Sequence, residues 1–329
     1  MKIRTAILML LCMALILSAG ATAEYAVGDR FELTIMHTHD IHGRTDALSR
    51  YASYVEEVRR AEENVLVLDG GDTFRRGPLE QFQGQMEAEI FNLMNYDAVT
   101  LGNHEFNVPA DEKDAADCNA MISAISEATN APVVCANVVY SESGAYLDGV
   151  EPYVIVERDG VRIGIIGITS MKPMNREMAE VTDKDFLNAT ESLEKCLAEL
   201  EGQTDINIVL SHAGLIEDLS MGQLGHDDSW AYGYQIAAIL SADDHLMLEK
   251  PLYYFYGTEK GIPIFQHGGE LNHTLGRLDL EFEVTEQGFK LVDHEGYVCD
   301  VSAATPDPRV DAIVAEYTAA AEAETEAAA

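Results

Sequence analysis

Positive charge is scarce in this 329-residue sequence, in which 21 Lys and Arg face 57 Asp and Glu, for a formal net charge of −36. Such an imbalance favours a soluble monomer through self-repulsion, and it opposes binding to nucleic acid or to an anionic membrane. A high-salt habitat is an alternative explanation of the same composition. An anionic substrate would also be repelled unless bound divalent cations reversed the field locally.

Long apolar runs are absent beyond the amino terminus, so no later segment is expected to span a membrane. The first residues do carry such a run, preceded by Lys2 and Arg4 and followed by the small residues Ala21-Thr22-Ala23. This order is typical of a signal peptide. We therefore predict a signal peptide over residues 1–23 and an exported protein (secreted, periplasmic or cell-surface) without a stable membrane span after cleavage. An uncleaved anchor is the alternative.

Cysteine is also sparse, and no two cysteines have the C-x-x-C spacing of a redox or metal motif. An exported protein could pair its thiols, although the sequence does not fix a pairing. A core of this size needs no covalent cross-links, so we predict buried free thiols. The cysteines after the leader are Cys118, Cys135, Cys196 and Cys299.

Strand-like and helix-like segments alternate along residues 24–304, which predicts one α/β domain with helices covering mixed sheets. Strands are expected at 31–38, 65–68, 98–101, 132–138, 154–156, 162–168, 206–210, 262–265 and 277–283. Helices are expected at 46–63, 79–95, 111–129 and 186–200. Residues 305–329 form an acidic, Ala/Glu-rich tail, helical to about Ala320 and then either solvated helix or disorder with no partner face.

Five short segments place oxygen and nitrogen ligands just after expected strands. Taken alone, each is more often an ordinary turn, helix start or hydrogen-bonded histidine than a metal site. Their recurrence at strand ends matches the place where α/β sheets carry their sites. The segments are HTHDIHG (37–43), LDGGDTF (68–74), LGNHEF (101–106), LSHAG (210–214) and, more weakly, LSADDH (240–245).

The first four segments resemble the successive metal-binding blocks of calcineurin-like metallophosphoesterases. The resemblance is greatest to the amino-terminal domain of the 5′-nucleotidase/UshA/2′,3′-cyclic-nucleotide phosphodiesterase family. The later stretch GIPIFQHGGELNHTLGRLDLEFE resembles the closing segment of that domain, so the likeness extends from residue 31 to residue 284. It implies a four-layer αββα sandwich of two mixed β-sheets flanked by helices.

The resemblance also implies two divalent metal ions, of which Zn, Mn or Fe suit mixed Asp, His and Asn ligands. Asp72 would bridge the two ions. Catalytic His104 would lie beside the substrate phosphate together with Asn103, and Arg76 is a further candidate for contacting that phosphate. The implied metal ligands are Asp40, His42, Asp72, Asn103, His212, Asp243 and His245.

The sequence departs from the family pattern at three places. Asp243 stands where a histidine normally completes the second metal site, and Gly225-His226-Asp227 is a rival for that block. Asn107 replaces an aspartate that would orient the catalytic histidine, and Arg75-Arg76 adds a residue to the second block. A carboxylate at position 243 would shift the site toward harder ions such as Mn²⁺ or Mg²⁺.

The resulting prediction is an exported two-metal phosphoesterase. It would hydrolyse phosphomonoesters of the nucleotide type by direct attack of a metal-bound water. A 2′,3′-cyclic-nucleotide phosphodiesterase is one alternative, and a non-catalytic exported binding protein on the same scaffold is another. Nucleotidases of this family carry a second, nucleoside-binding domain, and the sequence leaves open whether this chain is a stand-alone enzyme or a fragment.

Overall fold

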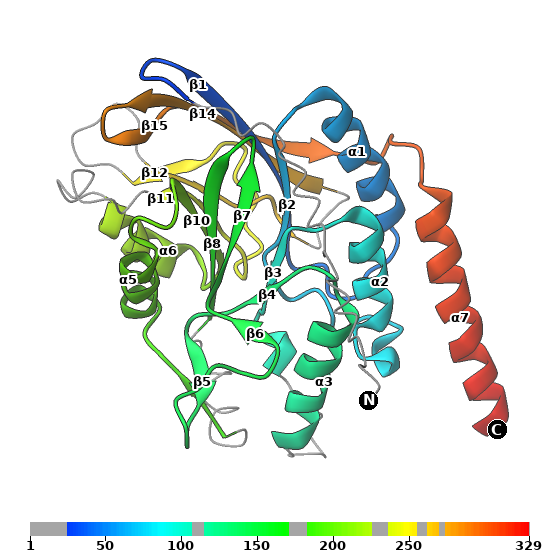
Figure 1. Ribbon diagram of the computed structural model, residues 1–329. Helices are drawn as coiled ribbons and strands as arrows, with labels where there is room; N and C mark the ends of the chain where they lie inside the picture. The colour runs from blue at the N-terminus through cyan, green and yellow to red at the C-terminus, as the bar shows by residue number, and fades with distance from the viewer. Residues whose placement is uncertain are drawn as a thin grey trace, which may run out of the picture.

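Two mixed β-sheets lie face to face at the centre of the molecule (Figure 1). The computed structural model describes residues 25–106, 115–170, 183–225, 236–254, 262–269 and 274–328. The seven-stranded sheet has the order β15 (Gly288–Asp300), β14 (Thr274–Thr285), β1 (Arg30–Thr38), β2 (Val65–Asp69), β3 (Ala98–Thr100), β4 (Val133–Val134) and β6 (Val150–Glu151). The six-stranded sheet has the order β12 (Leu252–Tyr254), β13 (Ile262–Phe265), β11 (Ile236–Leu240), β10 (Ile206–His212), β8 (Val161–Thr169) and β7 (Tyr153–Arg158). A small third sheet pairs β5 (Val138–Tyr140) with β9 (Lys184–Phe186).

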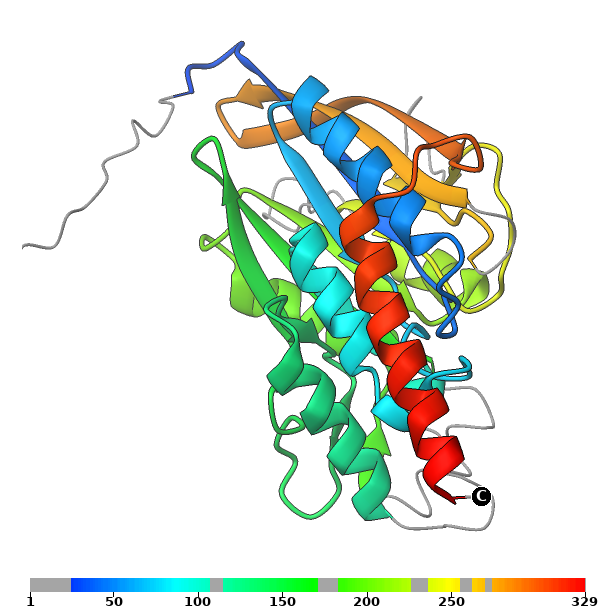
Figure 2. The same cartoon turned by 90° about the vertical axis from the view of Figure 1, so that its right-hand side faces the viewer.

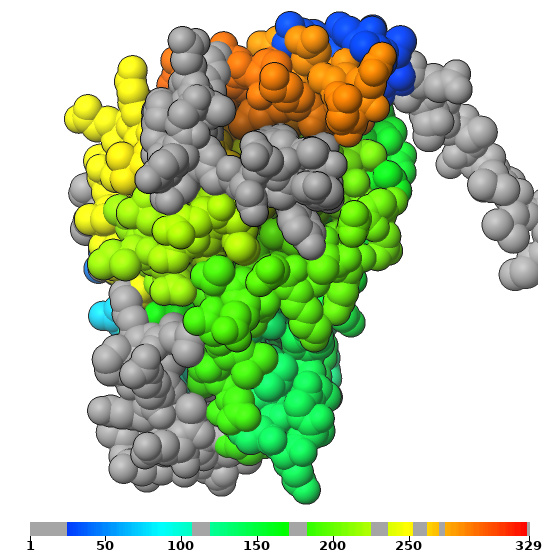
Figure 3. All heavy atoms as spheres, turned by 90° about the vertical axis from the view of Figure 1, so that its left-hand side faces the viewer, coloured from blue at the N-terminus to red at the C-terminus, as the bar shows by residue number. Residues whose placement is uncertain are grey.

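Helices cover the outer face of each large sheet. The seven-stranded sheet is covered by α1 (Leu48–Ala61), α2 (Gln85–Met94), α3 (Ala115–Ala128) and α7 (Pro308–Ala328), which cross the front of Figure 2. The six-stranded sheet is covered by α5 (Ala189–Leu200) and α6 (Leu215–Met221), on the side that faces the viewer in Figure 3. Three short 3-10 helices span Glu80–Phe82, His104–Phe106 and Gly222–Gly225.

Strand alternation explains the four layers. In β2, Leu66 and Leu68 point into the core between the two sheets, whereas Val65 and Val67 point toward the helices. Successive side chains of a strand alternate between faces, so a strand buried on both sides presents apolar residues throughout. All five residues of β2 are buried. The predicted αββα sandwich is therefore confirmed.

Local differences from the predicted elements have identifiable causes. The expected helix over 79–95 is interrupted at Gln83 and Gly84, which both adopt left-handed backbone with φ of 51° and 78°. The expected strand over 132–138 divides into β4 and β5, which belong to different sheets. Strand β15 was not predicted, because its residues alternate between half-buried and exposed at the edge of the sheet.

Helix α7 is continuous to Ala328, and its first turns pack against the core that α1 and α2 also line. Val310 is fully buried there, and the ring of Tyr317 meets that of Phe82 with centroids 5.0 Å apart. From Glu322 onward the described side chains are exposed, so the end of this segment is solvated helix, one of the two predicted alternatives.

The thiols described by the structure are unpaired. Cys135 and Cys196 are buried and Cys299 is half-buried, whereas the side chain of Cys118 lies outside the described residues. The prediction of buried free thiols is thus confirmed for the first two. Within the described residues no helix is both long and apolar enough to cross a membrane, and the expected signal peptide lies outside them.

Candidate metal centre

The loops that follow β1 and β2 run together at the carboxyl edge of the seven-stranded sheet. Three backbone hydrogen bonds join them: Gly70 N–H donates to the Thr38 carbonyl at 2.7 Å, Asp40 N–H to the Gly71 carbonyl at 2.8 Å, and His42 N–H to the Asp72 carbonyl at 2.8 Å. The parallel pairing of β1 with β2 makes this possible, because both strands end at the same edge. The first two predicted ligand blocks are therefore adjacent in space.

Backbone strain marks this region. Five of the predicted ligands adopt a left-handed backbone conformation, which residues other than glycine rarely do. Such conformations persist where the surrounding structure imposes them, and they are concentrated at functional sites. Their φ values are 51° for Asp40, 50° for His42, 54° for Asp72, 78° for Asp243 and 52° for His245.

The side chains of these loops converge with those that follow β10 and β11 in the second sheet. His212 Nε2 lies 3.1 Å from Asp72 Oδ2, and His245 Nε2 lies 3.0 Å from Asp40 Oδ1 and 3.3 Å from His42 Nε2. Ligand atoms within 4.8 Å of one another form three overlapping groups: Asp40, His42 and His245; His42, Asp72 and His104; and Asp40, Asp72 and His212. We call these six residues the acidic cluster.

The electrostatics of the acidic cluster favour positive charge. Burial alone would lower the pKa of His212, but the carboxylates of Asp72 and Asp40 outweigh it and raise the pKa well above its ordinary value. His212 Nδ1 lies 2.6 Å from the Gly70 carbonyl, to which it donates, so Nε2 faces the two carboxylates. Metal-ligating histidines are oriented in the same way, with one ring nitrogen fixed by a hydrogen bond to the protein and the other directed at the site.

The two other predicted ligands border the acidic cluster. The Oδ1 atom of Asn103 is buried and forms no hydrogen bond to the residues that the structure describes, as expected of an amide oxygen that serves a cation. Asp243 Oδ1 lies 3.9 Å from His212 Nε2, and its backbone N–H donates to Asp40 Oδ2 at 3.0 Å. A donor set of carboxylate, imidazole and amide groups around these atoms fits divalent metal ions.

His104 and Arg76 lie at the solvent side of the cluster. The backbone N–H of His104 donates to Asp72 Oδ1 at 2.7 Å, and its ring is partly exposed. Arg76 Nη1 lies 3.5 Å from His104 Nε2. Burial is the largest effect on the His104 ring and lowers its pKa, which favours the neutral imidazole over the imidazolium in the site as it stands.

Two buried carboxyl groups that support the loops were given no role from the sequence. Glu105 accepts backbone N–H groups from Asp72 at 3.0 Å, Gly102 at 2.7 Å and Phe74 at 3.1 Å. Its place in the N-H-E block was the available signal, but a sequence does not reveal which backbone groups a buried carboxylate will accept. Asp69 likewise accepts the hydroxyl groups of Thr38 at 2.7 Å and Thr73 at 2.9 Å.

Three residues singled out from the sequence lie outside the described residues: Asn107, at which the sequence departs from the family pattern, and His226 and Asp227 of the rival block. Asp243 borders the acidic cluster and His245 belongs to it, whereas the rival block at 225–227 stays an untested prediction.

Comparisons with known proteins agree with this geometry. A probable 5′-nucleotidase of Treponema pallidum is 30% identical over 259 residues, which cover 72% of this chain and 40% of that protein. The trifunctional nucleotide phosphoesterase YfkN of Bacillus subtilis is 26% identical over 279 residues, 77% of this chain and 18% of the relative. This chain thus spans less than half the length of either curated relative.

Solved structures share the fold. The 5′-nucleotidase precursor of Thermus thermophilus superposes with a TM-score of 0.70 at 22% identity, over 89% of this chain and 59% of that one. The calcineurin-like phosphoesterase structure of YfkN gives 0.69 at 21% identity, over 88% and 97%. The family profile described as calcineurin-like phosphoesterase matches residues 33–247, which is more than half of the sequence. The chain therefore belongs to the calcineurin-like phosphoesterase family.

Proposed function

We propose that this protein is an exported metal-dependent phosphoesterase that hydrolyses phosphomonoesters of the 5′-nucleotide class. The observation that carries the proposal is the convergence of Asp40, His42, Asp72 and His212 from the ends of two sheets, with ligand atoms within 4.8 Å of one another in overlapping groups. The buried carboxylates of Asp40 and Asp72 repel each other, and a cation held between them would relieve this repulsion.

Calcineurin-like phosphoesterases use two divalent metal ions. Asp40, His42 and His245 would hold the first ion, Asn103, His212 and Asp243 the second, and Asp72 would serve both. The ions would supply the positive charge that a phosphoryl group requires and would make water nucleophilic near neutral pH.

His104 is proposed as the catalytic residue that acts on the phosphoryl group. Its backbone is fixed by Asp72 and its ring lies on the solvent side of the cluster, which is the side from which a substrate enters. A dianionic phosphate beside the ring would raise its pKa by attraction of opposite charges and so offset the effect of burial. The protonated ring could then donate a hydrogen bond to a phosphoryl oxygen or give its proton to the leaving oxygen.

Arg76 is proposed to bind the substrate phosphate. Its guanidinium lies 3.5 Å from the His104 ring, whereas neighbouring Arg75 is engaged with Glu80 Oε1 at 2.6 Å. In a chain with net charge −36, one arginine at the mouth of the site provides local attraction for an anion.

The substrate class rests on the relatives. Their printed names are 5′-nucleotidase and nucleotide phosphoesterase, and this chain matches only part of each. A cyclic phosphodiester would meet the same metal-binding residues, so the test compares both substrates. AMP, 2′,3′-cyclic AMP and bis-p-nitrophenyl phosphate would be offered to protein that has been chelated and reloaded with Mn²⁺ or Zn²⁺.

The expected result is turnover of AMP with about two ions bound at the acidic cluster, and its loss in Asp72→Ala. Faster turnover of the cyclic substrate would replace the monoesterase assignment with a phosphodiesterase. Absence of turnover of every substrate by fully loaded protein would reject catalysis and leave a binding protein.

Export and domain limits are proposed on the sequence alone. The charged, apolar and small-residue order of residues 1–23 supports cleavage near Ala23. Amino-terminal sequencing of protein recovered outside the cytoplasm would test it, and a retained Met1 would contradict it. The proposed catalytic domain spans residues 24–304, followed by the acidic segment 305–329.

A further inference from the structure

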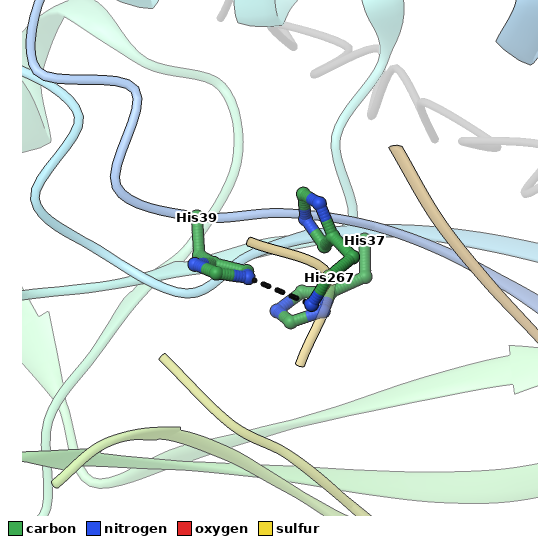
Figure 4. A group of neighbouring side chains, drawn as sticks. All are labelled: His37, His39 and His267. Atoms are coloured by element: carbon green, nitrogen blue, oxygen red, sulfur yellow. Dashed lines mark hydrogen bonds between the residues drawn. The ribbon is translucent and has the colours of Figure 1, made fainter. Parts of the chain in front are cut away.

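Three buried histidines gather next to the acidic cluster, and we call them the histidine trio: His37, His39 and His267 (Figure 4). His37 belongs to β1 and His39 follows its last residue, whereas His267 follows β13 of the other sheet. Their ring centroids lie 5.0, 5.3 and 4.1 Å apart, and no ring is more than 1% exposed. The trio therefore joins the two sheets at their carboxyl edges.

The ring nitrogens of the trio are poorly satisfied. Neither nitrogen of His37 nor either nitrogen of His267 forms a hydrogen bond to any residue that the structure describes. A buried polar atom without a partner costs about 1–3 kcal/mol, so such atoms call for an explanation. A neutral imidazole carries one lone pair and one N–H group, so each of these two adjacent rings has a lone pair without a described donor. A metal ion could be held by both lone pairs.

His39 is held in the orientation of a metal ligand. Its Nδ1 lies 2.6 Å from Asp40 Oδ2, and because an ionised carboxylate only accepts hydrogen bonds, Nδ1 carries the proton. The lone pair of Nε2 therefore faces His267, whose backbone N–H donates to it at 3.2 Å. A histidine whose second nitrogen donates to a carboxylate is the usual arrangement around a bound metal, and an ion at Nε2 would replace the long bond from His267.

We propose that His37, His39 and His267 bind a third metal ion, a divalent transition metal of the zinc type, distinct from the ions of the acidic cluster. Imidazole suits Zn, Cu, Fe and Ni, whereas Mg and Mn prefer the oxygen ligands that this set lacks. Three histidines are a known zinc-binding set. Burial keeps the rings of His37 and His267 neutral, which is the form that binds metal.

The geometry is close to what such an ion requires. The three ligand atoms lie within 4.8 Å of one another, whereas ligands at zinc bond lengths in a tetrahedron lie about 3.4 Å apart. Binding an ion would therefore draw the three rings slightly closer together. The negative charge of Asp40, transmitted through the His39 ring, offsets part of the cost of placing a dication in a buried site.

The backbone around the trio leaves no room for other side chains. A Cβ atom at Gly70 would lie 2.9 Å from His39 Cβ and 3.1 Å from His37 Nε2, and one at Gly276 would lie 2.9 Å from His267 Cδ2. The rings are thus supported by bare backbone from both sides. An ion here would tie β1 to the loop after β13.

The test is a difference in metal content. Wild-type protein, His267→Ala and His267→Gln would be chelated, reloaded with excess Zn²⁺, desalted and measured by mass spectrometry, with AMP turnover and thermal unfolding recorded on the same samples. We expect one zinc fewer per chain in both variants than in the wild type, with turnover retained. Because the readout is a difference of one ion, it is independent of how many ions the acidic cluster holds and of whether the protein hydrolyses AMP.

Equal zinc content in the wild type and a folded variant would overturn the proposal and leave three neutral histidines without an ion. If neither variant folds, X-ray diffraction from crystals of the wild-type protein still tests the proposal. Crystals of the zinc-loaded protein should give an anomalous peak between the three rings. Its absence, in crystals that show zinc at the acidic cluster, would equally reject the site.

Discussion

His212 and His37 are both fully buried, yet the pKa values of the two rings shift in opposite directions. In the acidic cluster, Asp72 and Asp40 raise the pKa of His212 well above its ordinary value. In the histidine trio, the ring nitrogens of His37 form no hydrogen bond to the described residues, and desolvation lowers the pKa of this ring well below its ordinary value. Proton affinity at a buried histidine is therefore decided by its charged neighbours and not by its depth. Asp40 belongs to the acidic cluster and, through His39, also supports the trio.

The largest effect should follow from Asp40→Asn, which removes the charge that the two clusters share. We expect kcat/KM to fall by more than the ~10²–10³-fold typical of one preorganised electrostatic group. The pKa of His212 should also fall, because one of its two raising carboxylates is gone. Steady-state kinetics and NMR titration of the metal-free protein would check both. Unchanged titration of His212 would contradict our explanation of its raised pKa.

The buried carboxyl of Glu87 extends the comparison to a group that has other carboxylates as its charged neighbours. Burial, together with repulsion from Glu105 and Glu80, raises the pKa of Glu87 from 4.5 to about 7. The folded state thus binds the Glu87 proton more tightly than the unfolded state does. The contribution of this proton to the free energy of unfolding is fully present below pH 4.5 and is lost as the pH rises through about 7. Glu87→Gln should remove that loss and stabilise the protein at pH 8 by up to about 3 kcal/mol.

Urea unfolding of wild type and Glu87→Gln at pH 4.5 and pH 8 would measure this effect. The two proteins should differ little at the lower pH and most at the higher. A parallel pH dependence in both proteins would show that Glu87 is ionised without cost. Glu127→Gln, at an exposed position of α3, is the matched control and should change neither value.

Comparing His39→Ala with His267→Ala should separate two roles of the trio, which are support of the Asp40 carboxylate and binding of the proposed third ion. His39→Ala removes the donor that holds Asp40 Oδ2, and loss of such a supporting group typically costs about 10–100-fold in activity or metal affinity. His267→Ala, which alters the trio without touching Asp40, should leave kcat within about twofold. The comparison is made by kcat and by Mn²⁺ affinity of the acidic cluster. Equal activity of the two variants would show that the hydrogen bond from His39 to Asp40 does not matter for turnover.

The smallest change should come from Arg76→Ala, with an increase in KM for AMP of about tenfold, as expected for one charged hydrogen bond to phosphate. Arg75→Ala is the control, because its side chain already pairs with Glu80. Steady-state kinetics of both variants would decide. An unchanged KM in Arg76→Ala would remove this residue from the substrate site.

Sequence reasoning predicted most of the fold because strands buried on both faces, such as β2 and β10, are rich in apolar residues along their whole length. It missed β15, whose edge position leaves a mixed pattern, and it joined β4 to β5 because no local signal marks a change of sheet. The contact of Tyr317 with Phe82 was invisible for a similar reason, since a weakly amphipathic, alanine-rich helix does not reveal which face it buries.

For the site, the ligand residues could be predicted because their segments lie at strand ends and resemble the metal-binding blocks of the family. Their mutual distances could not, because these depend on how the two sheets are aligned. The histidine trio escaped notice for the same reason. His37 and His39 belong to the first block, whereas His267 lies more than 220 residues further along and reaches them only through the packing of β13 against the other sheet.

Strand β1 lies between β2 and β14 in the seven-stranded sheet, and Phe31 to His37 pair with residues 282 to 276. The first strand to be synthesised therefore obtains its second neighbour only after residues 274–285 have left the ribosome. Until then the segment that carries Asp40 and His42 has one open edge. The site to which Asp40 and His42 belong can therefore be completed only after residue 285 has been synthesised, so metal loading follows the pairing of the first and the fourteenth strand of this domain.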